Sequence, residues 1–344
     1  MKRHTKKVVC IVSNLFVILM LLSSCTKSIL YFPGSVQHEV DKAVGKSYDG
    51  MIVHVNLAKT SADHTAGWKD KKKKIPATKN SLFKIASISK LYIAVATVKL
   101  INSGKLSLDN TLEELLPEVA GNIEFADKIT LKMLLQHRSG IPEYIYKPGF
   151  AGSDPSVDYM TTIALIYKDP AKFEPNKEYA YSNTNYLLIG EILNRTLGHS
   201  YHKFIRSEIL SPLQLEHTYS LSTEVDSNEM MSGYFVDSED DLKSVEIHTR
   251  PGGEMVATAE DVSLFLRALV EGSLLTEKEQ EIYNSVASYE HTGWVNGYTS
   301  IAKYHKDIDA VIVQFVNTSK GELFWIRLKK DYNRIVKAVK KEYF

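Results

Sequence analysis

A serine and a lysine three residues apart could perform acyl-transfer chemistry, and this 344-residue chain contains that spacing five times. The pairs are Ser24/Lys27, Ser81/Lys84, Ser87/Lys90, Ser200/Lys203 and Ser300/Lys303. Only Ser87 and Lys90 stand at the start of a long apolar run, Ile88 to Ile101, whose nearly continuous apolar character predicts a buried helix. Positions i and i+3 of a helix share a face, so Lys90 can reach Ser87.

This placement favours Ser87 as a nucleophile. The first turn of a helix has unpaired backbone N–H groups and a positive dipole end, which favour an alkoxide or an acyl oxyanion. Burial disfavours the charged form of a lysine, which would make Lys90 a usable base. The alternative is an ordinary lysine at a helix start whose ammonium group reaches solvent. The pair alone does not decide between these interpretations.

Two further triplets decide between them. Tyr-x-Asn occurs once, at Tyr181 to Asn183, and His-Thr-Gly occurs once, at His291 to Gly293. The order Ser-x-x-Lys, Tyr-x-Asn, His-Thr-Gly resembles the serine β-lactamase and penicillin-binding-protein superfamily, in its class C-like branch of DD-peptidases, esterases and β-lactamases. The resemblance covers roughly residues 35–320 and includes the stretches GWKDKKKKIPATKNSLFKIASISK, GKLSLDNTLEELLPE, ITLKMLLQHRSGIPEY, FEPNKEYAYSNTNYLLIGEIL and PGGEMVATAEDVSLFL.

The resemblance implies a role for each motif residue. Ser87 would form the acyl-enzyme, Lys90 would take its proton, and Tyr181 would assist as a phenolate-like base or proton shuttle. The substrate-binding residues would be Asn183, which donates to the substrate's amide carbonyl, and His291, Thr292, Gly293 and Trp294. The backbone N–H groups of Ser87 and Trp294 would form the oxyanion hole, in which losing one donor typically costs about 10²–10³ in rate.

The chain departs from the family pattern around the third motif. Glu290 stands where glycine is usual, Trp294 stands where a small residue is usual, and His291 replaces a lysine. A neutral imidazole holds a carboxylate less strongly than an ammonium group does, so we expect little β-lactamase activity. Taken singly, Tyr181 could instead be a core aromatic, Asn183 a helix cap and His291 a residue on a strand surface.

The expected function is therefore a serine hydrolase of the DD-peptidase or esterase type, acting without a cofactor on a small-molecule, ester or peptidoglycan-peptide substrate. The alternatives are a catalytically silent lipoprotein that binds cell-wall peptides and a genuine class C-like β-lactamase. No Gly-x-Ser-x-Gly occurs, which argues against an α/β-hydrolase. Without His-Glu-x-x-His, the scattered histidines predict no metal site, and we interpret His137 as structural.

Strand and helix patterns indicate how these residues are positioned. Strands are predicted near both ends of the chain, at Gly50–Lys59 with a hairpin partner at His64–Asp70, and at Gly297–Lys306 and Asp309–Asn317. Helices are predicted at Ser35–Val44, Thr130–His137, Asn185–Gly198, Thr258–Gly272 and the C-terminus. We therefore expect an α+β, serine β-lactamase/transpeptidase-like domain at 34–344. Its antiparallel sheet is built from both chain ends and flanked by helices, with a mainly helical lobe inserted at roughly 110–275.

The N-terminus resembles a bacterial lipoprotein signal. A basic start precedes 15 residues of mainly apolar character, Val8 to Leu22, too few for a bilayer span but typical of a signal core. The following Ser-Ser-Cys25 resembles a lipobox, which implies removal of residues 1–24, a lipid anchor on Cys25 and a tether at 25–33. The alternative is an ordinary signal peptide cut near the serines. We expect a secreted protein, lipid-anchored and periplasmic or on the cell surface, without disulfides because Cys10 is the only other cysteine.

Charge limits the classes of partner. The 42 Lys and Arg nearly balance the 41 Asp and Glu, and loss of the signal would remove basic residues only, so no global basicity indicates nucleic-acid binding. The run KDKKKK, Lys69 to Lys74, is most simply a solvated turn between two strands. Attraction to anionic lipid or cell-wall polymer is the alternative. The sequence leaves the oligomeric state open.

Overall fold

The computed structural model describes residues 33–150, 157–244 and 250–344, and the chain from Ser35 to Phe344 packs as one unit. The predicted signal peptide, Cys25 and nearly all of the predicted tether lie outside the described residues. Among the helices of the described part, none is long and apolar enough to cross a membrane.

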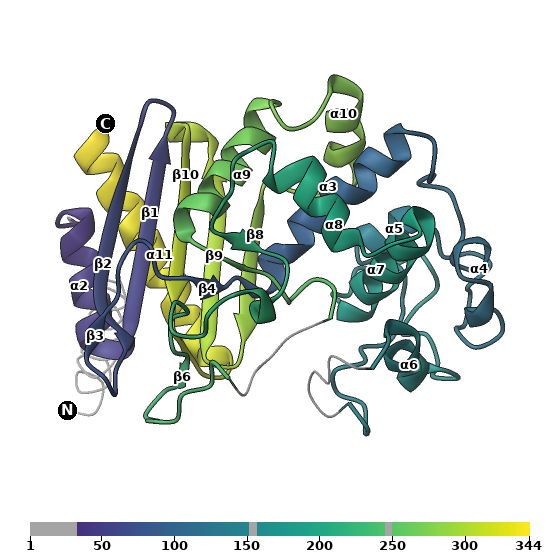
Figure 1. Ribbon diagram of the computed structural model, residues 1–344, viewed down its shortest axis with the longest axis horizontal. Helices are drawn as coiled ribbons and strands as arrows, with labels where there is room; N and C mark the ends of the chain where they lie inside the picture. Colours follow the sequence, from purple (N-terminus) through teal and green to yellow (C-terminus); the bar gives the residue numbers. More distant parts are fainter. Residues whose placement is uncertain (1–32, 151–156, 245–249) are drawn as a thin grey trace, which may run out of the picture. The chain divides into compact units, whose positions relative to one another are not determined.

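A six-stranded antiparallel sheet joins the two ends of this unit (Figure 1). Its order is β3 (Ile75–Pro76), β2 (Thr60–Asp70), β1 (Gly50–Leu57), β10 (Ala310–Val316), β9 (Tyr298–His305) and β8 (Glu290–Val295). β1 pairs directly with β10, so that Met51 faces Val316 and Leu57 faces Ala310. The predicted sheet built from both chain ends is therefore confirmed.

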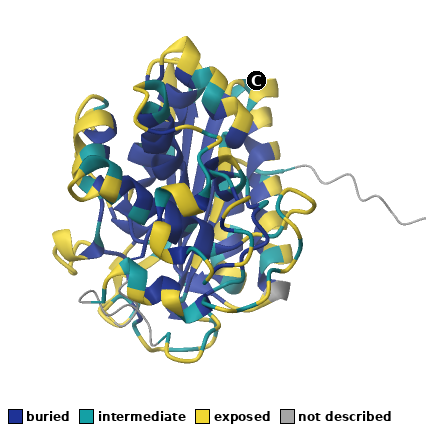
Figure 2. Cartoon of the chain, turned by 90° about the vertical axis from the view of Figure 1, so that its right-hand side faces the viewer, coloured by how far each residue is buried: buried dark blue, intermediate teal, exposed yellow. Residues whose placement is uncertain are grey.

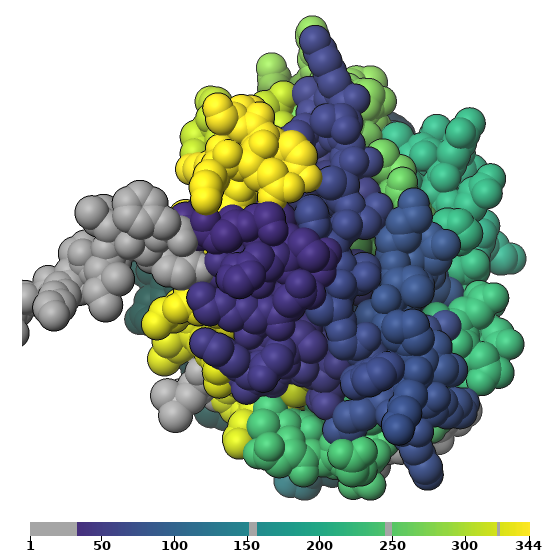
Figure 3. All heavy atoms as spheres, turned by 90° about the vertical axis from the view of Figure 1, so that its left-hand side faces the viewer, coloured from purple at the N-terminus to yellow at the C-terminus, as the bar shows by residue number. Residues whose placement is uncertain are grey.

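The central strands are buried because helices cover both faces of the sheet. Every residue of β10 is buried. Its sequence AVIVQFV is rich in the β-branched residues Val and Ile, which suits a strand covered on both faces. α2 (Val36–Ser47) and α11 (Glu322–Tyr343) cover one face, where Val53 and Ile312 pack with Leu328. α9 (Ala259–Glu271) covers the other face. Figure 3 shows α2 in purple beside the yellow C-terminal helix.

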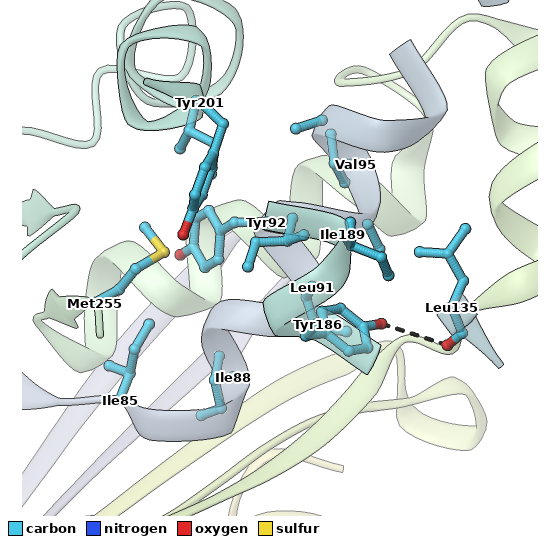
Figure 4. Packing of buried hydrophobic residues seen from close by; sticks show 14 of the residues in the cluster. Ile85, Ile88, Leu91, Tyr92, Val95, Leu135, Tyr186, Ile189, Tyr201 and Met255 are labelled. Carbon is cyan, nitrogen blue, oxygen red and sulfur yellow. Dashed lines mark hydrogen bonds between the residues drawn. The ribbon is translucent and has the colours of Figure 1, made fainter. Parts of the chain in front are cut away.

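The helical part of the fold surrounds α3 (Ser89–Asn102), which is buried almost all round as its sequence predicts. Leu91, Tyr92 and Val95 of α3 lie in one core with Tyr186 and Ile189 of α7 (Figure 4). The other helices of this region are α4 (Leu112–Leu115), α5 (Leu131–Leu135), α6 (Tyr159–Ile163), α7 (Asn183–Leu197), α8 (Tyr201–Ile205) and α10 (Glu277–Val286). Figure 2 shows that buried residues gather in the sheet and on the inner sides of the helices.

Two details differ from the sequence prediction. We placed α9 within the inserted helical lobe, but α9 packs across β1 and β10, where Asn56 donates to Ser263 and Arg267 donates to the Asn56 carbonyl. The helical pattern identified the apolar face of α9 but not the element that it covers. The α-helix after the nucleophile begins at Ser89, because a short 3-10 helix, η1 (Ala86–Ile88), precedes it.

The lysine run forms the predicted turn between β2 and β3. Lys71 is only partly exposed and pairs with Asp49 at 3.0 Å and Glu239 at 3.1 Å. The remaining lysines of the turn, Lys72 to Lys74, are exposed. The run is therefore partly used in internal ion pairs and otherwise solvated.

Candidate active site

Ser87 lies in the 3-10 turn η1, between the short strand β4 (Phe83–Lys84) and α3. The preceding residue, Ala86, has a φ of +52°, an uncommon value for a residue other than glycine. Two hydroxyl groups hold this backbone. Ser89 Oγ donates to the Ala86 carbonyl at 2.6 Å, and Ser300 Oγ on β9 donates to the Ile85 carbonyl at 3.2 Å. The turn that carries Ser87 is thus hydrogen-bonded both to α3, through Ser89, and to β9, through Ser300.

The Lys90 side chain is 1% exposed and has a complete set of hydrogen-bond acceptors. Its Nζ donates to Ser87 Oγ at 3.1 Å, to Asn183 Oδ1 at 2.9 Å and to the Gly252 carbonyl at 2.6 Å. An ammonium group has three donors, so these contacts fix its direction. Gly252 has a φ of +87°, and a Cβ there would lie 2.9 Å from Lys90 Cγ. A larger residue at position 252 would therefore displace the lysine.

Tyr181 brings a phenol to the same serine. Its hydroxyl donates to Ser87 Oγ at 2.9 Å, and its ring remains 38% exposed. The ring stacks on His137, with centroids 4.3 Å apart. Burial, with the nearby Lys90 and His291, lowers the pKa of His137 to about 3, so this imidazole is neutral. Its Nδ1 lies 3.3 Å from the Ser182 backbone N–H that donates to it, which ties His137 to the Tyr181–Asn183 segment.

Asn183 is the first residue of α7, and its contacts extend the predicted constellation to a residue that the motifs did not reveal. Its backbone N–H and its Nδ2 donate to Glu143 Oε2 at 2.7 and 3.0 Å. We predicted that Asn183 donates to the substrate. A carboxamide nitrogen carries two donors, so one remains for that purpose while Glu143 holds the other. The sequence signal for Glu143 was its place in the block that ends SGIPEY.

The third motif lies on β8, which runs against the turn that bears Ser87. Gly293 is buried, and a Cβ at this position would lie 2.3 Å from the Ile85 carbonyl oxygen. Only glycine permits this approach, which places the two predicted oxyanion donors, the N–H groups of Ser87 and Trp294, on adjoining elements. The Trp294 side chain is 43% exposed.

The unusual Glu290 has a structural explanation. It faces Lys303 across the β8–β9 pair, and the two side chains form an ion pair at 2.5 Å. Opposite charges at facing positions of neighbouring strands stabilise a sheet. Because Glu290 is exposed and already paired, it adds no free negative charge beside Ser87.

His291 is partly exposed at the edge of the site, and its ring centroid lies 6.2 Å from that of Tyr181. Burial and the charge of Lys90 lower the pKa of His291 to about 4. Its Nδ1 lies 2.6 Å from the Thr292 carbonyl oxygen. The imidazole is therefore neutral near pH 7 and supplies no positive charge to a substrate carboxylate.

A cleft of about 800 Å³ borders this constellation at Tyr181 and the third motif. Tyr181, His291 and Thr292 are among its lining residues. The end of α10, the edge of the sheet and α11 also contribute to the lining, with residues that include Arg138, Ser285, Ser288, Lys303 and Lys329. A second hollow, of about 410 Å³, lies between α2 and α11 and contains no residue of the three motifs. Within the described ranges, no group of three or more His, Cys, Asp or Glu side chains is arranged to hold a metal ion.

Comparison with known families and proteins shows what the chain is similar to. The Beta-lactamase family model matches residues 37–286. Among curated proteins, the chain is 27% identical over 236 residues to Protein flp of Staphylococcus aureus (strain MW2), covering 67% of this chain and 47% of that protein. It is 30% identical over 178 residues to Penicillin-binding protein 4* of Bacillus subtilis (strain 168), covering 50% of this chain and 38% of that protein. The chain therefore spans less than half the length of these relatives.

A solved structure shares the fold over nearly the whole chain. D-amino acid amidase from Ochrobactrum anthropi SV3, complexed with L-phenylalanine, superposes with a TM-score of 0.80 at 23% sequence identity. The match covers 90% of this chain and 99% of that chain. The described domain thus has the predicted β-lactamase-like fold.

Proposed function

Because the chain belongs to the beta-lactamase family, whose members include serine hydrolases, we propose that it is a serine hydrolase that forms an acyl-enzyme on Ser87. One observation carries the proposal. Ser87 Oγ lies 3.1 Å from Lys90 Nζ and 2.9 Å from the Tyr181 hydroxyl. Two groups that can transfer a proton therefore contact the same nucleophile. Nucleophilic catalysis requires a hydroxyl within hydrogen-bond reach of such a group.

In the proposed acylation, Lys90 acts in its neutral amine form, which has a lone pair for a proton. Ser87 Oγ bonds to the substrate carbonyl carbon while its proton passes to Lys90 Nζ. The carbonyl oxygen becomes an oxyanion and accepts hydrogen bonds from the backbone N–H groups of Ser87 and Trp294. The bond to the leaving group then breaks. Tyr181 donates its hydroxyl proton to the leaving group and regains a proton from Lys90. Water subsequently attacks the acyl carbon, which releases the acid and returns a proton to Ser87.

For the substrate, we propose esters or peptides of the DD-peptidase or esterase type, with little hydrolysis of β-lactams. The neutral state of His291 supports this choice, because a β-lactam's carboxylate finds no permanent cation at the third motif. Nitrocefin, a short-chain p-nitrophenyl ester and a D-Ala-D-Ala peptide should be assayed side by side. We expect the ester to be the fastest substrate. Efficient nitrocefin hydrolysis with negligible ester turnover would instead assign a class C-like β-lactamase.

Glu143 favours a second candidate substrate, the amide of an amino acid with a free α-amino group. Its half-buried carboxylate lies beside Asn183, the residue that we predict to donate to the substrate's amide carbonyl. A carboxylate there would attract an ammonium group. A solved structural neighbour is named a D-amino acid amidase, which is consistent with this candidate. D-phenylalanine amide should then be hydrolysed faster than its N-acetyl derivative, and Glu143→Gln should remove that preference.

The catalytic proposal competes with a silent cell-wall peptide-binding protein. A fluorophosphonate probe and a p-nitrophenyl ester distinguish the two. Wild type should be labelled and should turn over the ester, whereas Ser87→Ala should do neither. A protein that labels weakly and turns over no ester, peptide or lactam would be a binding protein.

We also propose that Cys25 carries a lipid anchor that holds the domain at a membrane, on the periplasmic or cell-surface side. The lipobox-like Ser-Ser-Cys25 supports it. Cys25→Ser expressed in a bacterial host should lose the lipid, seen as a mass change, and should leave the membrane fraction. Membrane fractionation equal to that of wild type would place the tether elsewhere.

A further inference from the structure

Glu254 is a buried carboxylate two residues after Gly252, which contacts Lys90. It is 2% exposed, and none of the three motifs includes it. Its Oε2 accepts a hydrogen bond from the Gly253 backbone N–H at 2.7 Å, and its Oε1 accepts one from the Tyr201 hydroxyl. Burying a charged group is costly unless it is paired, so this arrangement calls for an explanation.

The geometry points to Glu254 as a positioning residue for Lys90. The carboxylate holds the 252–254 backbone, and that backbone presents the Gly252 carbonyl to Lys90 Nζ at 2.6 Å. Gly252 also packs against the aliphatic part of the Lys90 side chain, because a Cβ added at Gly252 would lie 2.9 Å from Lys90 Cγ. Movement of this segment would therefore change both the hydrogen bond that Lys90 Nζ donates to the Gly252 carbonyl and the packing of Gly252 against the Lys90 side chain. The inference rests on the proposed role of Lys90 as the base for Ser87.

The surroundings keep Glu254 in its acceptor form. Burial raises its pKa, but the neighbouring His202 and Tyr201 hold the pKa of Glu254 below its usual range overall. His202 Nε2 lies 3.6 Å from Oε1, which is longer than a hydrogen bond. Tyr159 and Arg250 also face this cluster. Burial and the Glu254 charge raise the pKa of Tyr201 well above its usual value, so the phenol stays a donor.

The contact also links two parts of the fold at the lysine. Tyr201 lies in α8 of the helical part and belongs to the core around α3 (Figure 4). The segment after Glu254 enters β7 (Val256–Ala257), which pairs with β4 immediately before the Ser87 turn. In addition, the Met255 backbone N–H donates to Ser89 Oγ at 3.3 Å. Glu254 therefore stabilises a backbone connection that touches the turn bearing Ser87 as well as Lys90.

The test compares Glu254→Gln with Glu279→Gln in the full chain. Glu279 is a matched control, because it is also a buried carboxylate that accepts from one backbone N–H, of Thr276, and one side chain, of Asn102. Both variants replace a charge by an amide of equal size. Thermal unfolding, the rate of fluorophosphonate labelling of Ser87, and kcat and KM for a small p-nitrophenyl ester are measured for each.

For Glu254→Gln we expect labelling and kcat to fall by about 10- to 100-fold while KM changes little, because a displaced base slows acylation without altering binding of a small ester. Glu279→Gln should lose thermal stability but retain wild-type kcat. Tyr201→Phe, which keeps the ring but removes the donor to Glu254, should show a smaller loss of kcat in the same direction.

Wild-type labelling and kcat in a folded Glu254→Gln protein would overturn the inference. So would equal losses of kcat in Glu254→Gln and Glu279→Gln, since that result would indicate general loosening of the fold. If Glu254→Gln does not fold, Tyr201→Phe decides in its place, and unchanged kcat there would reject the inference. A wild-type protein that is not labelled and has no turnover would contradict the proposed function itself.

Discussion

Ser87 Oγ accepts hydrogen bonds from both Lys90 and Tyr181, so two side chains are placed to move its proton. They differ in accessibility, because Lys90 is buried and Tyr181 borders the cleft. This difference suggests a division of roles at the residue scale. Lys90 is suited to receive the serine proton in a dry environment, and Tyr181 is suited to hand a proton to a leaving group that departs through the cleft.

Tyr181→Phe tests that division. We expect kcat/KM for a p-nitrophenyl ester to fall by about 10²–10⁴, the usual contribution of a positioned acid or base. Tyr179→Phe is the matched control, because Tyr179 also lies near His137 but has no hydrogen bond to Ser87 among the described contacts. It should retain activity within a few-fold. Equal losses in the two variants would argue against a proton-transfer role of the Tyr181 hydroxyl.

His137 gives a prediction for stability against pH. Its pKa of about 3 in the folded protein lies below the ordinary value of 6.5, so between these values the unfolded chain binds a proton that the native protein does not. Native stability contributed by neutral His137 is therefore lost as pH falls below about 6.5. Urea unfolding of wild type and His137→Gln from pH 7 to pH 4 should show the stability gap shrinking by about 1.4 kcal/mol per pH unit. A gap independent of pH would contradict the prediction.

At the scale of elements, the site depends on β8 lying directly against η1. Gly293 permits the approach, while Ser300 on β9 fastens the same turn through the Ile85 carbonyl. The proposed oxyanion donors come one from each element, so the distance between β8 and η1 controls their alignment. The Glu290–Lys303 ion pair joins β8 to β9 at its other end.

Gly293→Ala should therefore impair catalysis more than folding. The new Cβ would lie 2.2 Å from Ser300 Oγ and 2.3 Å from the Ile85 oxygen, so β8 must move away from the turn. We expect kcat/KM for the ester to fall by about 10²–10³, the cost of losing one oxyanion donor. Gly45→Ala in α2 is the control, since a Cβ there meets nothing within 4 Å. Full activity of Gly293→Ala would disprove this account of β8.

At the scale of the whole molecule, the two ends of the chain meet in one sheet. β1 pairs on one edge with β2 and on the other with β10, which lies some 250 residues later in the sequence. α2 and α11 pack together over the same face, and the Val36 backbone N–H donates to Glu342 at 2.8 Å. The first and last parts of the unit thus form one frame, made of β1, β10, α2 and α11. The segment between them carries α3, α7 and their motif residues.

A chain ending at residue 305 tests this dependence. It keeps every motif residue, but it lacks β10 and α11, which would leave β1 unpaired on one edge and expose the buried face packed on Leu328 and Ile335. We expect no fluorophosphonate labelling of Ser87 and mainly insoluble protein. Co-expression of residues 306–344 as a separate chain should restore part of the labelling. Wild-type labelling of the truncated chain alone would show that the frame is dispensable.

Much of this architecture could be predicted because periodicity and family motifs are local properties of the sequence. The apolar run after Ser87 predicted α3, alternation predicted β1, β9 and β10, and the order of three short motifs predicted the family. Element boundaries shifted by a few residues, and η1 was missed, because one 3-10 turn leaves no periodic pattern. α9 was assigned to the wrong part of the fold, because an amphipathic pattern shows which face is buried but not against what.

The sequence by itself indicated the chemistry that is possible, since Ser87 and Lys90 could be named from type and spacing, and Tyr181, Asn183 and His291 from the resemblance of the motif order to a known family. Only the tertiary structure decided how these groups are held. Glu143 reaches Asn183 across 40 residues, the Gly252 carbonyl reaches Lys90 across 162, and Gly293 allows β8 to touch the Ser87 turn. The neutral state of His291 was likewise decided there, because it arises from burial and from the field of Lys90, and neither is a property of the residue's neighbours in sequence.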